Sequence, residues 1–133
     1  MKEETIIFAV SMLLCLTSVV STSIGVASFY AEPYVPSACY GNNDNGTNII
    51  SVSDSLWDNG NACGRKYRLW CKPVTVDGIY QPCTADIAVN VFGYDATVVD
   101  RCGQCNGFTM LLSQEVFSAL TNTKDGQVQV EYM

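Results

Sequence analysis

The chain has 133 residues, no histidine, and 13 acidic against 7 basic residues, which gives a formal net charge of −6. This length fits a single domain. The acidic balance argues against nucleic acid as a partner, because phosphate binding needs a basic surface. Histidine is the commonest general base and the commonest zinc ligand, so its absence leads us to expect neither a metal site nor a cofactor.

The first element is an uncharged apolar segment at residues 6–20, IIFAVSMLLCLTSVV. It is shorter than the ~20 residues of a membrane-spanning helix. Small residues at Ser21 and Ser23 favour cleavage after Ser23. The sequence therefore predicts a signal peptide at 1–23 and a secreted, extracellular domain at 24–133, with no membrane insertion of the mature chain. An uncleaved membrane anchor is the alternative.

Export would place the remaining cysteines in an oxidising compartment. Cys15 lies in the apolar segment, and six others follow it: Cys39, Cys63, Cys71, Cys83, Cys102 and Cys105. An even number in a small secreted domain predicts three disulfides, although spacing alone leaves their connectivity open. Such links would supplement the modest core of a domain of about 110 residues.

Alternation of apolar and polar residues predicts β-strands along most of the domain. In KYRLWC, the pattern places Leu69 and Cys71 on one face and Arg68 and Trp70 on the other. The other expected strands are GVASFY at 25–30, NIISVS at 48–53, DIAVNV at 86–91, YDATVVD at 94–100 and QVQVEY at 127–132. DIAVNV is expected to turn Ile87, Val89 and Val91 inward.

One helix is expected at 114–120, where Ser113 can cap the N-terminus and an apolar stripe of Val116, Phe117 and Leu120 recurs with helical spacing. Loops are indicated at 41–46, 57–64, 76–82 and 124–126, which are rich in Gly, Asn and Asp. Several short strands, many turns and one short helix predict a small all-β barrel.

The spacing of Cys102 and Cys105 admits a redox pair, a metal clip or a structural disulfide. A redox pair needs a thiolate of lowered pKa, usually at a helix N-terminus, whereas this motif lies eight residues before the expected helix. A zinc site would need further cysteine or histidine ligands nearby. We therefore expect a structural disulfide.

Four of the basic residues lie within RKYRLWCK at 65–72, in an otherwise acidic domain. Aromatic and arginine side chains dominate binding hot spots, and Trp70 is expected to lie beside Arg68. We expect this strand, with the loop to Cys83, to form a binding surface for a partner; its residues are Arg65, Lys66, Arg68 and Trp70.

Two further features lie in the expected loops. Asn45-Gly46-Thr47 is an N-glycosylation sequon, which marks a surface position in a secreted chain whether or not a glycan is attached. Trp57 either stacks on a sugar ring or fills the barrel, and filling is the commoner role of a large aromatic side chain.

In order, the segments SFYAEPYVPSACYG, SLWDNGNACGRKYRLWC, QPC, VVDRCGQC, LSQEVFSAL and QVQVEY resemble those of plant natriuretic peptides and expansin-like secreted proteins. The domain of these proteins is similar to that of expansins, barwins and family-45 endoglucanases. The resemblance covers essentially the whole mature chain and implies a six-stranded double-psi β-barrel. It also implies the pairings Cys39–Cys63, Cys71–Cys83 and Cys102–Cys105.

Glycoside hydrolases on this barrel use two carboxyl groups across a groove, about 5–9.5 Å apart. By this resemblance, one acid belongs near SFY, where the chain offers only Glu32, and another belongs at Leu111. Asp100 alone remains, and a lone acid beside Arg101 is expected to be ion-paired or to cap a turn. The absence of histidine also argues against the Asp–His type of site in lytic transglycosylase relatives. We expect no enzymatic activity.

The resemblance implies a secreted apoplastic signalling protein that affects ion and water homeostasis and stress responses by binding a cell-surface receptor. The alternative is a cell-wall polysaccharide binder, in which Tyr30, Trp57 and Tyr94 stack on sugars near Asp100. A residual hydrolase that uses Asp100 is the third hypothesis.

Overall fold

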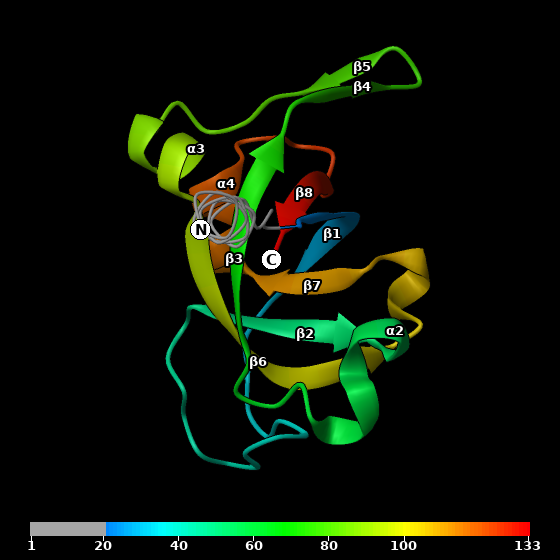
Figure 1. Ribbon diagram of the computed structural model, residues 1–133, viewed down its shortest axis with the longest axis vertical. Helices are drawn as coiled ribbons and strands as arrows, with labels where there is room; N and C mark the ends of the chain where they lie inside the picture. The colour runs from blue at the N-terminus through cyan, green and yellow to red at the C-terminus, as the bar shows by residue number, and fades with distance from the viewer. Residues whose placement is uncertain (1–20) are drawn as a thin grey trace, which may run out of the picture.

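Six strands close into a barrel in the computed structural model, which describes residues 21–133 (Figure 1). The strand order is β1-β7-β2-β6-β3-β8, in which β1 with β7 and β2 with β6 are the parallel pairs. The strands are β1 (Ser23–Tyr30), β2 (Ile49–Ser53), β3 (Lys66–Lys72), β6 (Tyr94–Gly103), β7 (Met110–Ser113) and β8 (Val128–Tyr132). This confirms the predicted six-stranded double-psi barrel.

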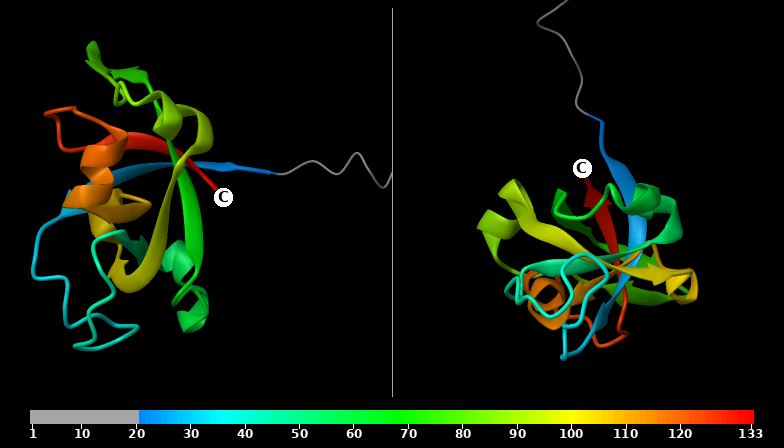
Figure 2. Two further views of the ribbon diagram at one scale, coloured as in Figure 1. Left: turned by 90° about the vertical axis from the view of Figure 1, so that its left-hand side faces the viewer. Right: turned by 90° about the horizontal axis from the view of Figure 1, so that it is seen from below.

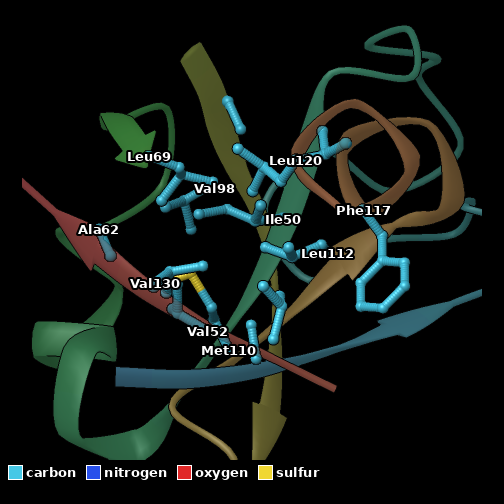
Figure 3. Close-up of a cluster of buried hydrophobic side chains, with 14 residues drawn as sticks. Ile50, Val52, Ala62, Leu69, Val98, Met110, Leu112, Phe117, Leu120 and Val130 are labelled. Carbon is cyan, nitrogen blue, oxygen red and sulfur yellow. The ribbon is translucent and has the colours of Figure 1, made fainter. Parts of the chain in front are cut away.

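The core lies inside the barrel and is filled by alternate residues of the strands (Figure 3). Leu69 on β3, Val98 on β6 and Val130 on β8 are fully buried, as the alternation of apolar residues predicts. The helix α4 (Gln114–Leu120) closes one end of this core with Val116, Phe117 and Leu120, and the Ser113 hydroxyl caps it by accepting from the Val116 amide at 3.2 Å. The capped helix at 114–120 is thus confirmed.

The prediction of a single helix is incomplete, because two more short α-helices occur within residues 21–133. One is α2 (Asp54–Trp57), followed by a 3₁₀ turn at Asp58–Gly60; a second 3₁₀ turn is Cys105–Gly107. The other is α3 (Ile87–Phe92), at the position of the strand expected at 86–91.

The expected strand at 86–91 is therefore wrong. Asp86 caps α3, since its carboxylate accepts from the Ala88 and Val89 amides at 3.0 and 3.4 Å. The four apolar residues of this six-residue segment fit both the two-residue period of a strand and the helical period. The N-cap at Asp86 favours the helix. Ile87 and Val91, expected inside, are 76% and 60% exposed, and only Val89 packs against the core.

The loop expected at 76–82 contains a hairpin of β4 (Val74–Val76) and β5 (Ile79–Gln81). Asp77 and Gly78 form its two-residue turn with positive φ at both positions, which is typical of Asp-Gly hairpins. The hairpin projects from one end of the barrel, and the long connection between β1 and β2 lies at the other end (Figures 1 and 2).

Three disulfides join Cys39 to Cys63, Cys71 to Cys83 and Cys102 to Cys105. This confirms the pairings that the family resemblance implied. Cys71 lies in β3, and Cys83 lies in the connection between β5 and α3. Among residues 21–133, no helix has the length and apolarity needed to cross a membrane. Residues 1–20 of the predicted signal peptide lie outside the described part of the chain.

Candidate functional site

Tyr30 and Asp100, which were both predicted to belong to the binding surface, lie near Tyr34 at the end of β1. The rings of Tyr30 and Tyr34 pack edge to face with centroids 5.1 Å apart. The Tyr30 hydroxyl is buried and has no hydrogen-bond partner among residues 21–133. Burial, together with the negative charge of nearby Asp100, raises the pKa of this hydroxyl well above its ordinary value. Tyr30 is therefore a neutral phenol, half-buried beside a carboxylate.

Tyr34 links this cluster to the start of α4. Its hydroxyl donates to Glu115 Oε2 at 2.9 Å and accepts from the Gln114 amide at 3.1 Å. Burial and the bond to Glu115 raise the pKa of the Tyr34 hydroxyl. A network of this kind holds the aromatic ring in one orientation, which suits a binding platform.

Tyr34 forms one wall of a cleft of about 540 Å³, called here the Tyr34 cleft. The connection between β1 and β2 supplies both sides of this cleft, and its lining residues are Glu32, Pro33, Tyr34, Val35, Asp44, Gly46 and Thr47. The cleft thus combines an aromatic ring, one prolyl side chain, one valyl side chain and two carboxylates. A sugar ring can stack on the aromatic ring, and its hydroxyl groups can donate to the carboxylates.

Asp100 was expected either to form an ion pair or to cap a turn, and it caps a turn. Its Oδ1 accepts from the Ala38 amide at 3.0 Å and from the Arg101 amide at 2.9 Å. The expected ion pair with Arg101 does not form, because the Arg101 guanidinium pairs with Asp54 at 2.7 Å. Leu111 is half-buried in β7.

The predicted basic surface lies on the outer face of β3, where its arginines are paired with acids. Arg65 contacts Asp58 at 3.2 Å, and Arg68 contacts Asp95 at 2.9 Å. The Arg68 guanidinium lowers the pKa of the Asp95 carboxyl. Lys66 is exposed on the same strand. The surface therefore carries less net positive charge than its sequence suggests.

The remaining predicted residues lie apart from the Tyr34 cleft or along its border. Trp57 is half-buried on α2 and packs against the core, which is the filling role. Tyr94 also packs against the core and donates its hydroxyl hydrogen to Asn48 Oδ1 at 2.7 Å. Asn45 is exposed in the loop that lines the cleft. No residue in 21–133 belongs to a cluster of three metal-ligating side chains.

Sequence reasoning missed the roles of Tyr34 and Glu115. They are 81 residues apart, so no local pattern relates them. It also missed the exposed apolar face of α3, because that segment was expected to be a strand. The one available signal was Asp86 before an apolar run, which is a typical helix N-cap.

Comparisons with known proteins agree on the family. A family model described as "Lytic transglycolase" matches residues 49–132. The EG45-like domain containing protein of Citrus jambhiri is 35% identical over 123 residues, covering 92% of this chain and 89% of that protein. EG45-like domain containing protein 2 of Arabidopsis thaliana is 36% identical over 118 residues, covering 88% of this chain and 84% of that protein.

Among solved structures, the apo expansin of Clavibacter michiganensis shares the fold with a TM-score of 0.55 at 18% identity. A variant of the same expansin, solved in complex with cellohexaose, has a TM-score of 0.60 at 20% identity. Each match covers 85% of this chain and 50% of the expansin, so the chain spans about half of the expansin's length. With its three disulfides and six-stranded barrel, this chain belongs to the family of EG45-like domain containing proteins, an expansin-like group of double-psi β-barrels.

Proposed function

We propose that this protein binds a polysaccharide chain of the cell wall in the Tyr34 cleft without cutting it. The observation that carries the proposal is the cleft of about 540 Å³ against the fixed Tyr34 ring. A volume of this size lies within the range of ligand sites in proteins. The cellohexaose complex of the expansin supports the choice of a β-linked glucan, because that protein has the same fold.

The chemistry of the cleft suits a neutral polyhydroxyl ligand. Tyr34 offers a ring on which a sugar face can stack, and the Glu32 and Asp44 carboxylates accept hydrogen bonds from sugar hydroxyls. Glu115 holds the Tyr34 hydroxyl and so acts as a positioning residue. No cation lines the cleft, so an anionic chain is disfavoured.

The expected absence of hydrolysis rests on Asp100 and Leu111, which lie outside the lining of the cleft. Leu111 takes the place of the second acid of hydrolytic relatives. Asp100 Oδ1 already accepts two backbone hydrogen bonds, so this carboxylate serves as a structural acceptor. The domain also has no histidine to take the part of a base. Binding in the apoplast, with removal of residues 1–23, remains our prediction for its location, and the three disulfides are consistent with secretion.

Titration of the purified, oxidised protein with cellohexaose by calorimetry tests this proposal. We expect saturable binding that Tyr34→Ala weakens about five- to thirtyfold, since loss of a stacked aromatic ring costs about 1–2 kcal/mol. Tyr34→Phe should retain most of the affinity because it keeps the ring.

The matched control is Tyr80→Ala, which removes an exposed tyrosine of the projecting hairpin and should leave the affinity unchanged. Equal binding by Tyr34→Ala and the unaltered protein would refute the cleft as the site. Trp57→Ala is a poor test, because Trp57 packs against the core.

A second function, receptor-mediated signalling in ion and water homeostasis, is favoured by the exposed face of α3. Ile87, Val91 and Phe92 are all exposed on this short helix. Asp86 lies at the start of the helix, and Arg68 lies beside Gly93 at its end. Such a face fits a protein ectodomain that has an exposed apolar surface of its own.

An ion-flux assay on plant protoplasts separates this function from the first. We expect Phe92→Ser to abolish the response and Tyr34→Ala to preserve it if signalling depends on α3. Phe92 is a better target than Arg68 and Trp70, because those two side chains contact Gly93 and their loss would disturb β3 and α3 together. A full response from Phe92→Ser would exclude this surface.

A further inference from the structure

A hollow of about 300 Å³ lies on the outer face of the barrel, on the side where α3 meets β3. Its lining residues are Thr22, Trp70, Cys71, Lys72, Asn90 and Glu131. None of them lines the Tyr34 cleft. We propose that this Trp70 hollow is a second saccharide site, which takes one pyranose ring stacked on the indole.

The barrel register places Trp70 on the outer face of the sheet. Trp70 of β3 and Ile24 of β1 are both paired with Glu131 of β8, so the three residues form one row across three strands. Leu69, the neighbour of Trp70 in the chain, is fully buried, and Ile24 is exposed. Because successive strand residues point to opposite faces, the indole projects outward.

The indole is also held in place. Its Nε1–H donates to the Val91 carbonyl at 3.4 Å, which ties it to α3. A Cβ built on Gly93 would lie 2.9 Å from Trp70 Cε2, so backbone and ring are in close contact there. A ring fixed by its surroundings loses little conformational entropy when a ligand stacks on it, and this is the property of an effective aromatic platform.

The polar groups around the indole match a neutral sugar. The Lys72 ammonium and the Glu131 carboxylate lie 3.5 Å apart and offset each other's charge. A hydroxyl group both donates and accepts, so one sugar hydroxyl can accept from Lys72 while another donates to Glu131. The Asn90 side-chain nitrogen donates to the Thr84 carbonyl. The side-chain oxygen of Asn90 can therefore accept a hydrogen bond from the sugar.

An anionic ligand would be repelled by Glu131 and a cationic ligand by Lys72, so a charged ligand would fit less well than a neutral one. A purely apolar ligand would cover the Lys72–Glu131 pair without offering a hydrogen bond to either side chain. The volume lies at the lower limit of ligand sites, which suits one sugar ring rather than a longer chain. Thr22 lies before the predicted cleavage point, so the argument rests on Trp70, Lys72, Asn90 and Glu131.

Two separate saccharide sites would change what the protein does in a wall. One molecule could hold two polysaccharide chains at once, and retention on an insoluble polysaccharide would exceed the affinity of either site through effective concentration. The Trp70 hollow and the Tyr34 cleft share no lining residue. Binding at each site can therefore be tested separately.

The test uses the two indole N–H signals of the protein, since the chain contains two tryptophans. Trp70→Phe assigns them in nitrogen-15 correlation spectra. On titration with cellobiose, we expect the Trp70 signal to shift saturably, and the same shift to persist in Tyr34→Ala. Sorbitol, an open-chain polyol without a ring face, should cause no such shift.

Two substitutions test the polar contacts. Lys72→Met and Glu131→Gln should each weaken the binding of cellobiose about fivefold, as expected for one partly exposed hydrogen bond. Gln129→Ala is the matched control, since Gln129 lies on the same strand but outside the lining of the hollow. A static Trp70 signal, an equal shift with sorbitol, or a shift that disappears in Tyr34→Ala would each overturn the proposal.

Discussion

Asp100 and Leu111 lie in one row of the barrel wall, on either side of Ser51. In the register of the strands, Ser51 of β2 is the partner of Asp100 in β6 and of Leu111 in β7. Two strand spacings separate the backbones of Asp100 and Leu111, or about 10 Å. This is close to the separation of the two carboxyl groups in an inverting glycosidase. An acidic side chain at residue 111 would therefore lie two strands away from Asp100 in the same row.

The first prediction follows from this row. The unaltered protein and Asp100→Asn should both release no reducing ends from a soluble β-glucan. Leu111→Asp should give measurable release, because it restores a second carboxyl group opposite Asp100. Leu111→Asn is the control, since it has the same shape and cannot donate or accept a proton as an acid does. Release by the unaltered protein that Asp100→Asn abolishes would contradict the non-hydrolytic function.

The second prediction concerns the structural role of Asp100. Its Oδ1 accepts from the Ala38 and Arg101 amides, so Asp100→Ala leaves both donors without this acceptor. We expect a loss of about 2 kcal/mol in the free energy of unfolding, measured by denaturant titration. Asp100→Asn keeps a carbonyl oxygen in place and should lose less than half as much. Equal losses for the two variants would show that charge, rather than the acceptor, matters.

The third prediction is an alkaline titration of the tyrosines. Burial and the Asp100 charge raise the pKa of Tyr30, so its phenol should ionise after the ordinary tyrosine value of about 10 is passed. The folded-state pKa of Tyr30 lies above its unfolded-state pKa. The contribution of Tyr30 to stability is therefore fully present below the unfolded-state pKa, and it is lost as the pH rises through the folded-state pKa. Ultraviolet absorbance of the phenolate measures the titration.

Tyr30→Phe should remove the late phase of this titration while the other six of the seven tyrosines remain. Unfolding in guanidinium chloride should also remove it, because the phenol then meets water. A late phase that survives Tyr30→Phe unchanged would assign it to another tyrosine, such as Tyr34, whose pKa is also raised.

The fourth prediction concerns Gly93, between α3 and β6. Its φ is +81°, and a Cβ there would lie 2.7 Å from Arg68 Cγ and 2.9 Å from Trp70 Cε2. Gly93→Ala should therefore cost about 3 kcal/mol in the free energy of unfolding, from backbone strain and overpacking together. Gly78→Ala separates the two effects, because Gly78 has φ +78° with no atom within 4 Å of a built Cβ. It should cost only about 1 kcal/mol.

The fifth prediction ranks the disulfides by the loops that they close. Cys39–Cys63 spans 24 residues of sequence separation and Cys102–Cys105 spans 3. The chain-entropy model assigns about 3.5 kcal/mol to the longer loop and about 2 kcal/mol to the shorter one. Thermal unfolding of the two double alanine variants should show the larger fall in Tm for Cys39→Ala/Cys63→Ala. The difference between the two variants should disappear in a reducing buffer, where all three links are open.

Much of the barrel could be predicted from local patterns. The two-residue alternation identifies β3 and β8, because a strand turns successive side chains to opposite faces whatever its neighbours are. Ser113 identifies the start of α4, because capping involves only the next three residues. The six cysteines indicate three links, and the family resemblance gave the right partners.

The site could be predicted only in part. Tyr30 and Asp100 were both among the predicted surface residues. Tyr34 and Glu115 were not, and they meet because β1 and β7 pair in parallel, which brings the connection after β1 to the start of α4. At 86–91 the apolar run is too short to distinguish a strand from a helix, and a single capping carboxylate decides.

From the sequence alone come the single acidic domain, its alternating strands, its even set of cysteines and the absence of histidine, since each of these is a property of composition or of near neighbours. The tertiary structure alone decided which side chains share a surface. Barrel closure pairs Arg68 with Asp95, separates Trp57 from the Tyr34 cleft and places Trp70 beside Glu131. Such contacts depend on strand register across long separations, which no local pattern encodes.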